Sequence, residues 1–188
     1  NGHRWGKQIF FMGIAILGIG LFWMQKDHYK AYQQWNKAQM FYNNKAYEAA
    51  LEVYEPLYPL LKHKPEFLFE AAQSLSKTGQ YEKANEYLER AVLLSSDPML
   101  YYVMAKNEQC LGEYRQAEKH LLHAIDILPE RIYPYYLLMN LYTEPSYFQP
   151  AKLKMAIDSV LTKKPKVESS AIKEMKEKAR SMLNNTSI

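Results

Sequence analysis

The sequence predicts an all-α protein in which about four helical hairpins stack into a superhelix, preceded by one transmembrane helix and followed by a capping helix. Two columns of residues carry this prediction, because an aromatic residue and an alanine recur together at spacings of 34, 33 and 34. The pairs are Tyr47 with Ala50, Tyr81 with Ala84, Tyr114 with Ala117, and Phe148 with Ala151. A constant period of this length indicates two-helix units that bury their apolar faces only against their neighbours.

Composition narrows the possible functions only slightly. The chain has 188 residues and a net charge of +4, but its 24 basic residues are interspersed with 20 acidic ones. We therefore expect no nucleic-acid partner. Cys110 is the single cysteine, which excludes an internal disulfide framework. Because the chain begins with Asn rather than Met, we expect it to be part of a longer or processed polypeptide.

Residues 1–25 are predicted to hold the transmembrane helix and its flank. Residues 9–24 form a run of 16 without a charged or strongly polar side chain. At the helical rise this run spans about 24 Å, a little less than a hydrocarbon core of roughly 30 Å. Trp5 and Trp23 bracket it, as interfacial aromatic residues do. A cleavable signal peptide would need small residues after the apolar core, and LFWMQKD supplies none. A buried helix of a water-soluble protein remains the alternative.

The four predicted repeats occupy residues 26–62, 65–97, 98–130 and 131–164. The first helix of the first repeat is expected to continue from the membrane helix to about Asn43. The second helix begins near Ala46, and Pro56 and Pro59 are expected to kink or end it before Lys64.

The second and third repeats have clear boundary signals. Pro65, and Asp97 followed by Pro98, are typical of helix starts. Gly79 and Gly112 are expected to turn the chain between the two helices of each hairpin.

The fourth repeat is irregular, because its turn is expanded to EPSYFQP. We expect Phe148 and Ala151 to keep the register, with a second helix from Ala151 to Lys163. Residues 165–184 carry apolar residues near one helical face and Lys and Glu on the other, which predicts a capping helix. Residues 185–188 are predicted to be a frayed tail.

Small residues explain how such hairpins nest. Ala84, Ala91, Ala117 and Ala124 would let each second helix lie close to its neighbours, while the tyrosines fill the corner between helices.

The sequence contains no recognisable set of catalytic residues, so we expect a segment that is not an enzyme and needs no cofactor or metal. His120 and His123 have a spacing that can hold a metal, but they are expected to be ordinary residues on the solvent side of their helix. Cys110 has no basic cluster near it in sequence, and we expect a small, partly buried filler near the inner surface.

Residues 31–163 resemble the tetratricopeptide family through these columns and through Gly79 and Gly112; Lys45 and Ser146 depart from that glycine position. The resemblance implies a right-handed superhelix whose concave face binds a protein or peptide. It places the lining of that face at Trp35, Phe69, Gln73, Tyr102, Lys106, Tyr136 and Asn140. The subtype that grips chaperone C-termini uses a fixed set of Lys, Asn and Arg, whereas this lining is mostly Phe, Tyr and Gln. Aromatic residues also offer flat faces for sugar rings, so a glycan ligand stays open, as does packing of Tyr102 and Tyr136 between repeats.

The whole chain is similar to the C-terminal end of the O-antigen ligase and polymerase family of Bacteroidetes-type bacteria. Three segments of the sequence carry this similarity: the apolar span, the stretch from QWNKAQMFYNNKAYEAALEVY to YLERAVLLS, and RIYPYYLLMNLY. The resemblance implies the bacterial inner membrane, with the repeats in the periplasm. It favours a non-catalytic scaffold, anchored through residues 9–24, within a glycan-assembly protein. The alternatives are a part that holds glycan for the transferase itself and a stand-alone tethered adaptor.

Overall fold

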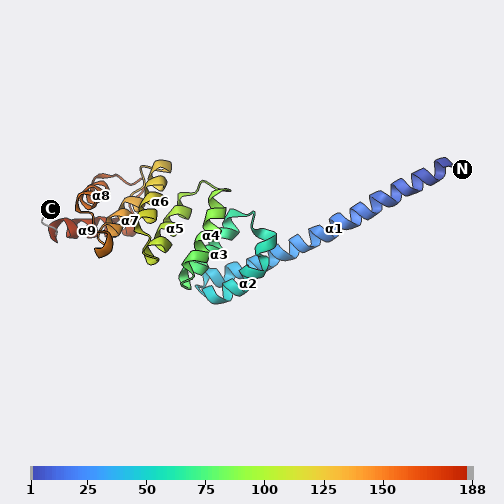
Figure 1. Ribbon diagram of the computed structural model, residues 1–188, viewed down its shortest axis with the longest axis horizontal. Helices are drawn as coiled ribbons and strands as arrows, with labels where there is room; N and C mark the ends of the chain where they lie inside the picture. Colours follow the sequence, from blue (N-terminus) through green and yellow to red (C-terminus); the bar gives the residue numbers. More distant parts are fainter. Residues whose placement is uncertain (1, 186–188) are drawn as a thin grey trace. The chain divides into compact units, whose positions relative to one another are not determined.

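The computed structural model describes residues 2–185, apart from the side chains of residues 2–9, 11, 21–25 and 185. In this part of the chain every regular element is helical (Figure 1). The elements are α1 (Gly2–Asn43), α2 (Tyr47–Leu61), α3 (Pro65–Lys77), α4 (Tyr81–Val92), α5 (Pro98–Cys110), α6 (Tyr114–Ile127), α7 (Tyr133–Leu141), the 3-10 turn η1 (Pro145–Tyr147), α8 (Pro150–Thr162) and α9 (Ser170–Asn185). Of the tail predicted to be frayed, residues 186–188 lie outside the described part.

The chain divides into two compact units, residues 1–63 and residues 64–188. In the first unit α1 runs without a break for 42 residues, and its C-terminal part packs against α2. Ala31 and Ala38 of α1 are buried, and their small side chains permit this close approach. The expectation of one uninterrupted helix ending near Asn43 is confirmed.

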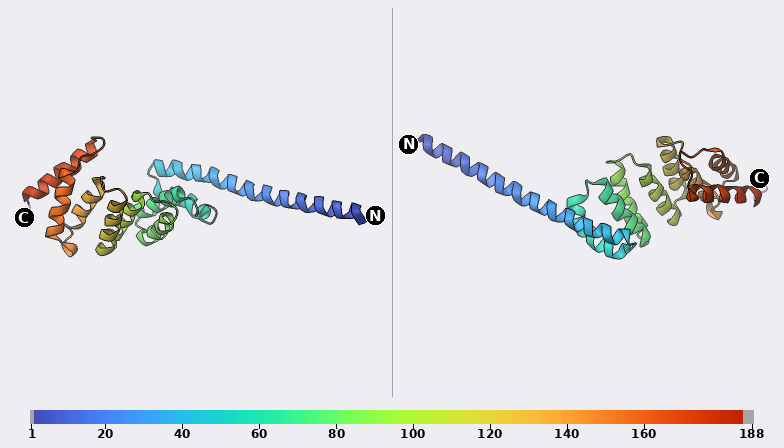
Figure 2. Two further views of the ribbon diagram at one scale, coloured as in Figure 1. Left: turned by 90° about the horizontal axis from the view of Figure 1, so that it is seen from above. Right: turned by 180° about the vertical axis from the view of Figure 1, so that it is seen from behind.

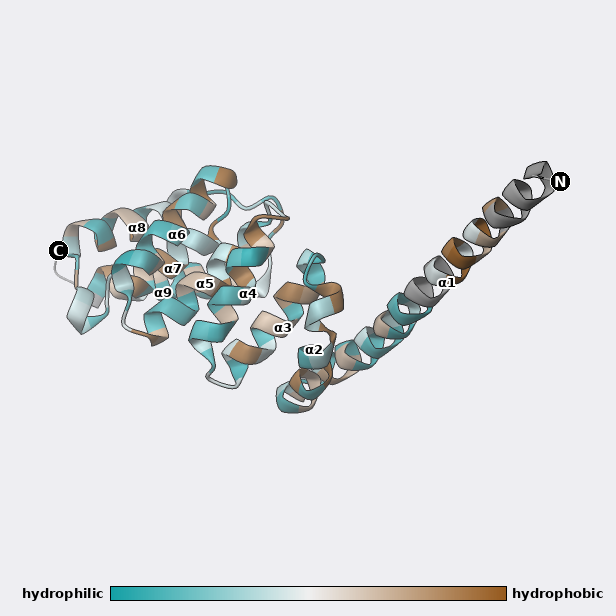
Figure 3. Cartoon of the chain, turned by 45° about the vertical axis from the view of Figure 1, so that its right-hand side comes forward, coloured by the Kyte–Doolittle hydropathy of each residue, from teal (hydrophilic) through white to brown (hydrophobic). Residues whose placement is uncertain are grey.

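The N-terminal half of α1 carries apolar side chains that no described part of the protein covers. Described side chains there have exposed fractions between 51% and 67%: Phe10, Met12, Ile14, Ile16, Leu17 and Ile19. Figure 3 shows brown turns in the coloured stretches of this half. The predicted membrane span also includes side chains at residues 9, 11 and 21–24, which lie outside the described set. Among described residues, no helix combines the length and the apolar character needed to cross a membrane.

Three hairpin turns share a left-handed residue. Gly79 and Gly112 have φ values of 82° and 78°, in the region where glycine avoids the steric penalty of a Cβ atom. Lys45 stands at the same place in the first hairpin and also adopts a positive φ, of 60°. The turn geometry is therefore retained there without glycine.

The two prolines of α2 do not end it, since the helix continues through Pro56 and Pro59 to Leu61. Of the two expected effects, a kink or an end, the end does not occur at either proline, and the helix stops at Leu61, before Lys64 as expected. Tyr54, Leu57 and Leu61 are buried along one stripe of the helix, and this burial compensates for the hydrogen bonds that the prolines remove.

The second unit is a translational stack of hairpins. α3 pairs with α4, α5 with α6, and α7 with α8, and the second helix of each hairpin packs on the first helix of the next. The first helices also contact one another in order: α3 with α5, α5 with α7, and α7 with α9. The two views of Figure 2 show this succession. α9 therefore takes the place of the first helix of a further repeat, as expected for a cap. Its Ala179 is fully buried against the stack.

The alanine columns form the centre of the core. Ala50, Ala84, Ala91, Ala117 and Ala124 are fully buried. The tyrosines of the other column are the first residues of α2, α4 and α6 and are half-buried.

The fourth hairpin departs from the predicted register. Phe148 is 51% exposed and Ala151 is exposed, so neither is a packing residue. α8 begins at Pro150, and Leu153 is the buried residue three positions after the helix start. Leu153 therefore occupies the place of Ala84 and Ala117. The expanded turn moves the start of the helix, and with it the buried stripe, by two residues.

Candidate functional site

The first helices of the hairpins in the second unit, α3, α5, α7 and α9, form a continuous surface, here called the A-helix face. A row of three tyrosine rings crosses it between α5 and α7. The rings of Tyr102 and Tyr133 meet edge to face with their centroids 5.2 Å apart, and those of Tyr133 and Tyr136 stack at 6.5 Å. Tyr102 lies one turn into α5, whereas Tyr133 is the first residue of α7 and Tyr136 lies one turn into it. Both helices have a proline in their first turn, which fixes the helix starts and hence the register between α5 and α7.

Two lysines cover this row. Lys106 Nζ lies 5.6 Å from the centroid of Tyr133, and Lys178 Nζ lies 5.4 Å from that of Tyr136. Lys178 Nζ also donates a 2.8 Å hydrogen bond to Oδ1 of Asn140. A cation over an aromatic face is attracted by the negative potential of the ring. The structure thus brings together Lys106, Tyr136 and Asn140 and adds a lysine of α9 to them.

Tyr102 has a different role from the one expected. It is 4% exposed, so its side chain packs between repeats and is not a surface for a partner. Its hydroxyl is buried and has no hydrogen-bond partner among the described residues. Burial raises the pKa of Tyr102; the charge of Arg131 opposes this shift and that of Asp97 adds to it. The alternative interpretation, packing between repeats, is correct for this residue.

The remaining predicted lining residues belong to α3 and α1. Phe69 and Gln73 are half-buried on α3. Phe69 borders a small cavity of about 240 Å³ at the start of α3 and α5, together with Glu66, Glu70 and Asp97. Trp35 belongs to the first unit, where its ring lies 5.8 Å from that of Tyr32 on α1.

A carboxylate that no sequence pattern had indicated joins the third and fourth hairpins. Glu118 on α6 accepts hydrogen bonds from the hydroxyls of Tyr142 and Tyr147, both at 2.6 Å, and from Lys152 Nζ at 2.7 Å. These donors lie 24, 29 and 34 residues away. Only the packing of the expanded turn against α6 brings them together, so no local pattern could have identified the cluster.

The electrostatics of this cluster follow from its contacts. Burial on its own would raise the pKa of Glu118, but the hydrogen bonds from Lys152, Tyr142 and Tyr147 outweigh it and lower that pKa below the ordinary 4.5. Burial and the bond to Glu118 raise the pKa of Tyr147 to about 12. The same two causes raise the pKa of Tyr142 far above 10.0. The cluster is therefore one carboxylate held ionised by two neutral phenols and an ammonium group.

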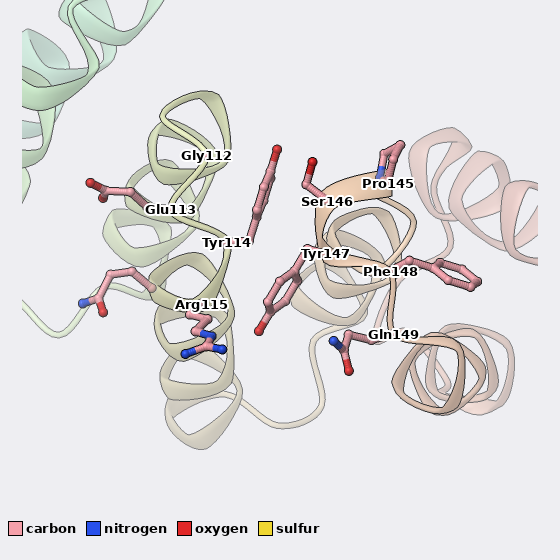
Figure 4. A pocket seen from close by; sticks show the side chains of 10 residues that line it. Gly112, Glu113, Tyr114, Arg115, Pro145, Ser146, Tyr147, Phe148 and Gln149 are labelled. Atoms are coloured by element: carbon pink, nitrogen blue, oxygen red, sulfur yellow. The ribbon is translucent and has the colours of Figure 1, made fainter.

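An open groove of about 870 Å³ runs beside this cluster, between the start of α6 and the expanded turn (Figure 4). The rings of Tyr114 and Tyr147 stack across it with centroids 5.7 Å apart. Phe148 borders the groove, but its ring points away from the tyrosine pair. The other lining residues are Gly112, Glu113, Arg115, Gln116, Pro145, Ser146 and Gln149.

Two expectations about single residues need correction. His120 is not a plain solvent-side histidine, because its Nδ1 lies 2.9 Å from the carboxylate of Glu108, which is 3% exposed on α5. Cys110 is exposed and not a partly buried filler. No group of three metal-ligating side chains occurs within the described residues.

Comparisons with known proteins agree with this architecture. A family model described as anaphase-promoting complex, cyclosome, subunit 3 matches residues 43–124. None of the curated protein sequences matches the chain.

Several solved structures share the fold. The protein MamA, residues 41 to the end, from Desulfovibrio magneticus RS-1 is 19% identical with a TM-score of 0.64, and the match covers 85% of this chain and 98% of that one. Another crystal structure of MamA is 18% identical with a TM-score of 0.62, covering 78% and 84% of the two chains. TPR-like repeats of a kinesin light chain-type protein from Podospora anserina are 17% identical with a TM-score of 0.61, covering 84% and 88%. Together with the periodic hairpins, these similarities show that the chain has a tetratricopeptide-like repeat fold.

Proposed function

We propose that this chain is a non-catalytic scaffold that is tethered to a membrane by the first half of α1 and binds a protein partner through the A-helix face. The observation that carries the proposal is the row of Tyr133 and Tyr136 with Lys106 and Lys178 above it. Aromatic rings supply rigid contact area at low entropic cost, and lysines at their edges supply charge that selects a partner.

The tether is supported by the exposed apolar side chains between Phe10 and Ile19 on α1, because leaving such a stretch in water costs free energy. On this basis, and on the sequence resemblance, we propose that the chain is the C-terminal part of an O-antigen ligase-like protein of a bacterial inner membrane, with its repeats in the periplasm.

Photocrosslinking tests the binding function. A photoreactive phenylalanine analogue at Lys106, on the A-helix face, is compared with one at Glu86, an exposed position on α4. Illumination of cells that express each substituted protein should crosslink a partner at position 106 and none at position 86. Proteinase should digest the partner in the adduct at position 106. An adduct that resists proteinase and reacts with periodate would identify a glycan instead. Equal adducts at both positions would exclude a binding role for this face.

The tether is tested on membranes. The chain should stay in the pellet after alkaline carbonate extraction, and a variant without residues 9–24 should be released. Protease added outside spheroplasts should digest the repeats if they are periplasmic. Release of the unaltered chain by carbonate would refute the tether, and protection from protease would refute the periplasmic location.

A further inference from the structure

Two ammonium groups of the A-helix face, those of Lys106 and Lys178, have no anionic partner among the residues that the structure describes. Among the described residues, neither Lys106 nor Lys178 forms an ion pair, whereas Lys152 on α8 pairs with Glu118 at 2.7 Å. Instead, the ammonium group of each lysine lies over a tyrosine ring. Both lysine side chains are exposed. The face therefore presents two positive charges whose counter-charge must come from outside the described part of the chain.

The rings also fix where these charges lie. Cation–π contacts restrict the two long side chains before any ligand arrives, which reduces the rotamer entropy that binding would cost. The rings beneath them are 6.5 Å apart. Alternate side chains of an extended strand point to the same side and repeat roughly every 6.5–7 Å.

Asn140 on α7 adds a polar group beside Lys178 of α9. Its Oδ1 accepts the hydrogen bond from Lys178, so the Nδ2 amide group faces away from that lysine as a donor. A main-chain carbonyl of a bound peptide is a suitable acceptor for it.

We infer that the A-helix face binds an extended acidic peptide segment of a partner protein, with carboxylates at alternate positions paired to Lys106 and Lys178 and the intervening side chains pointing away from the face. This inference rests on the proposed function and specifies the chemistry of the partner. Charge complementarity selects the acidic segment, and the spacing of the two rings beneath the lysines selects acidic residues at alternate positions.

Fluorescence anisotropy of the full 188-residue chain in a non-ionic detergent tests the inference. The probe is a labelled nine-residue peptide in which glutamate and leucine alternate, and the comparison peptides replace every glutamate by glutamine or by lysine. The acidic peptide should bind at least about tenfold more tightly than the glutamine peptide, and its affinity should fall as salt is raised.

Charge-reversal variants locate the site. Lys106→Glu combined with Lys178→Glu should weaken binding of the acidic peptide at least about tenfold. Lys119→Glu combined with Lys154→Glu, which makes the same charge change at exposed positions on α6 and α8, should alter it less than about twofold. Circular dichroism melting of each variant checks that the fold is retained.

The outcomes separate the inference from the proposed function. Equal, salt-independent binding of the glutamine peptide would overturn the acidic specificity while leaving peptide binding intact. An oligogalacturonate that displaces the acidic peptide at equal charge concentration would overturn the peptide as the occupant in favour of an anionic glycan. Equal weakening by Lys119→Glu combined with Lys154→Glu would show a non-specific charge effect and overturn the site. If none of the three peptides binds, the inference fails, and the crosslinking at Lys106 decides separately whether the face binds a protein.

Discussion

The phenolic oxygen of Tyr142, at the end of α7, donates a 2.6 Å hydrogen bond to Oε1 of Glu118 on α6. Tyr147 in the expanded turn reaches the other oxygen of the same carboxylate. One acidic side chain thus holds both the end of a first helix and the irregular turn that follows it. The longer turn of the fourth hairpin is ordered by this contact, although it lacks the glycine of the second and third turns.

Glu118→Gln should reduce the free energy of unfolding by about 1–3 kcal/mol at pH 7, since it weakens three charge-assisted hydrogen bonds. The folded-state pKa of Glu118 is lowered, so its stabilisation is present above the ordinary 4.5 and is lost as pH falls through the folded-state value. Urea unfolding between pH 3 and 6 should therefore show a shallower pH dependence for the variant than for the parent. Parallel pH profiles would contradict this assignment.

Tyr147→Phe tests the alkaline side of the same cluster. The folded-state pKa of Tyr147 is raised from 10.0 to about 12, so its stabilisation is complete below pH 10 and is lost as pH rises toward 12. Unfolding free energies of the parent and the variant should differ at pH 8 and converge above pH 11. Tyr114→Phe, on the ring stacked against Tyr147, is the matched control and should keep the parent's slope.

Tyr102→Phe should leave stability unchanged or raise it by up to about 1 kcal/mol, because it deletes a buried hydroxyl that has no partner. Thermal melting measures the effect, with Tyr142→Phe as the opposite case, since there the lost hydroxyl is bonded. A loss of more than about 1 kcal/mol in Tyr102→Phe would reveal a hydrogen bond to bound water.

Substitutions at the alanine column test the register of the fourth hairpin. Ala117→Leu should destabilise the fold by about 1–3 kcal/mol through overpacking, because Ala117 is fully buried. Ala151→Leu should change stability by less than about 0.5 kcal/mol, since Ala151 is exposed. Leu153→Ala should cost about 2–5 kcal/mol because it opens a cavity. Chemical denaturation of the three variants would refute the register if Ala151→Leu proved the most damaging.

Lys45→Gly should stabilise the first hairpin by about 1 kcal/mol, because a lysine in the left-handed region is strained and a glycine is not. Gly79→Lys, the reverse change at the equivalent turn, should destabilise by a similar amount. Differential scanning calorimetry measures both. A drop in melting temperature for Lys45→Gly would mean that the lysine side chain contributes a contact that outweighs its backbone strain.

The repeat architecture could be predicted from the sequence because its signals are local and periodic. Ala84 and Ala117 recur at the helical-repeat spacing, and Gly79 and Gly112 mark turns that need a positive φ. Each of these requirements concerns a residue and its near neighbours in the chain. That is why α3 and α5 begin at the predicted Pro65 and Pro98, and why the turns of the second and third hairpins fall at Gly79 and Gly112.

Tertiary structure alone decided the rest. The exposure of Ala151 and the convergence of Tyr142, Tyr147 and Lys152 on Glu118 depend on how an expanded turn packs against a helix some 30 residues earlier. The burial of Tyr102 depends on the packing of α5 against α7, where its ring meets that of Tyr133. A periodic pattern specifies which face of a helix is buried, but an insertion resets the phase of that pattern. The new phase is set by which side chains can satisfy one another across the hairpins, and that is a property of contacts between distant residues.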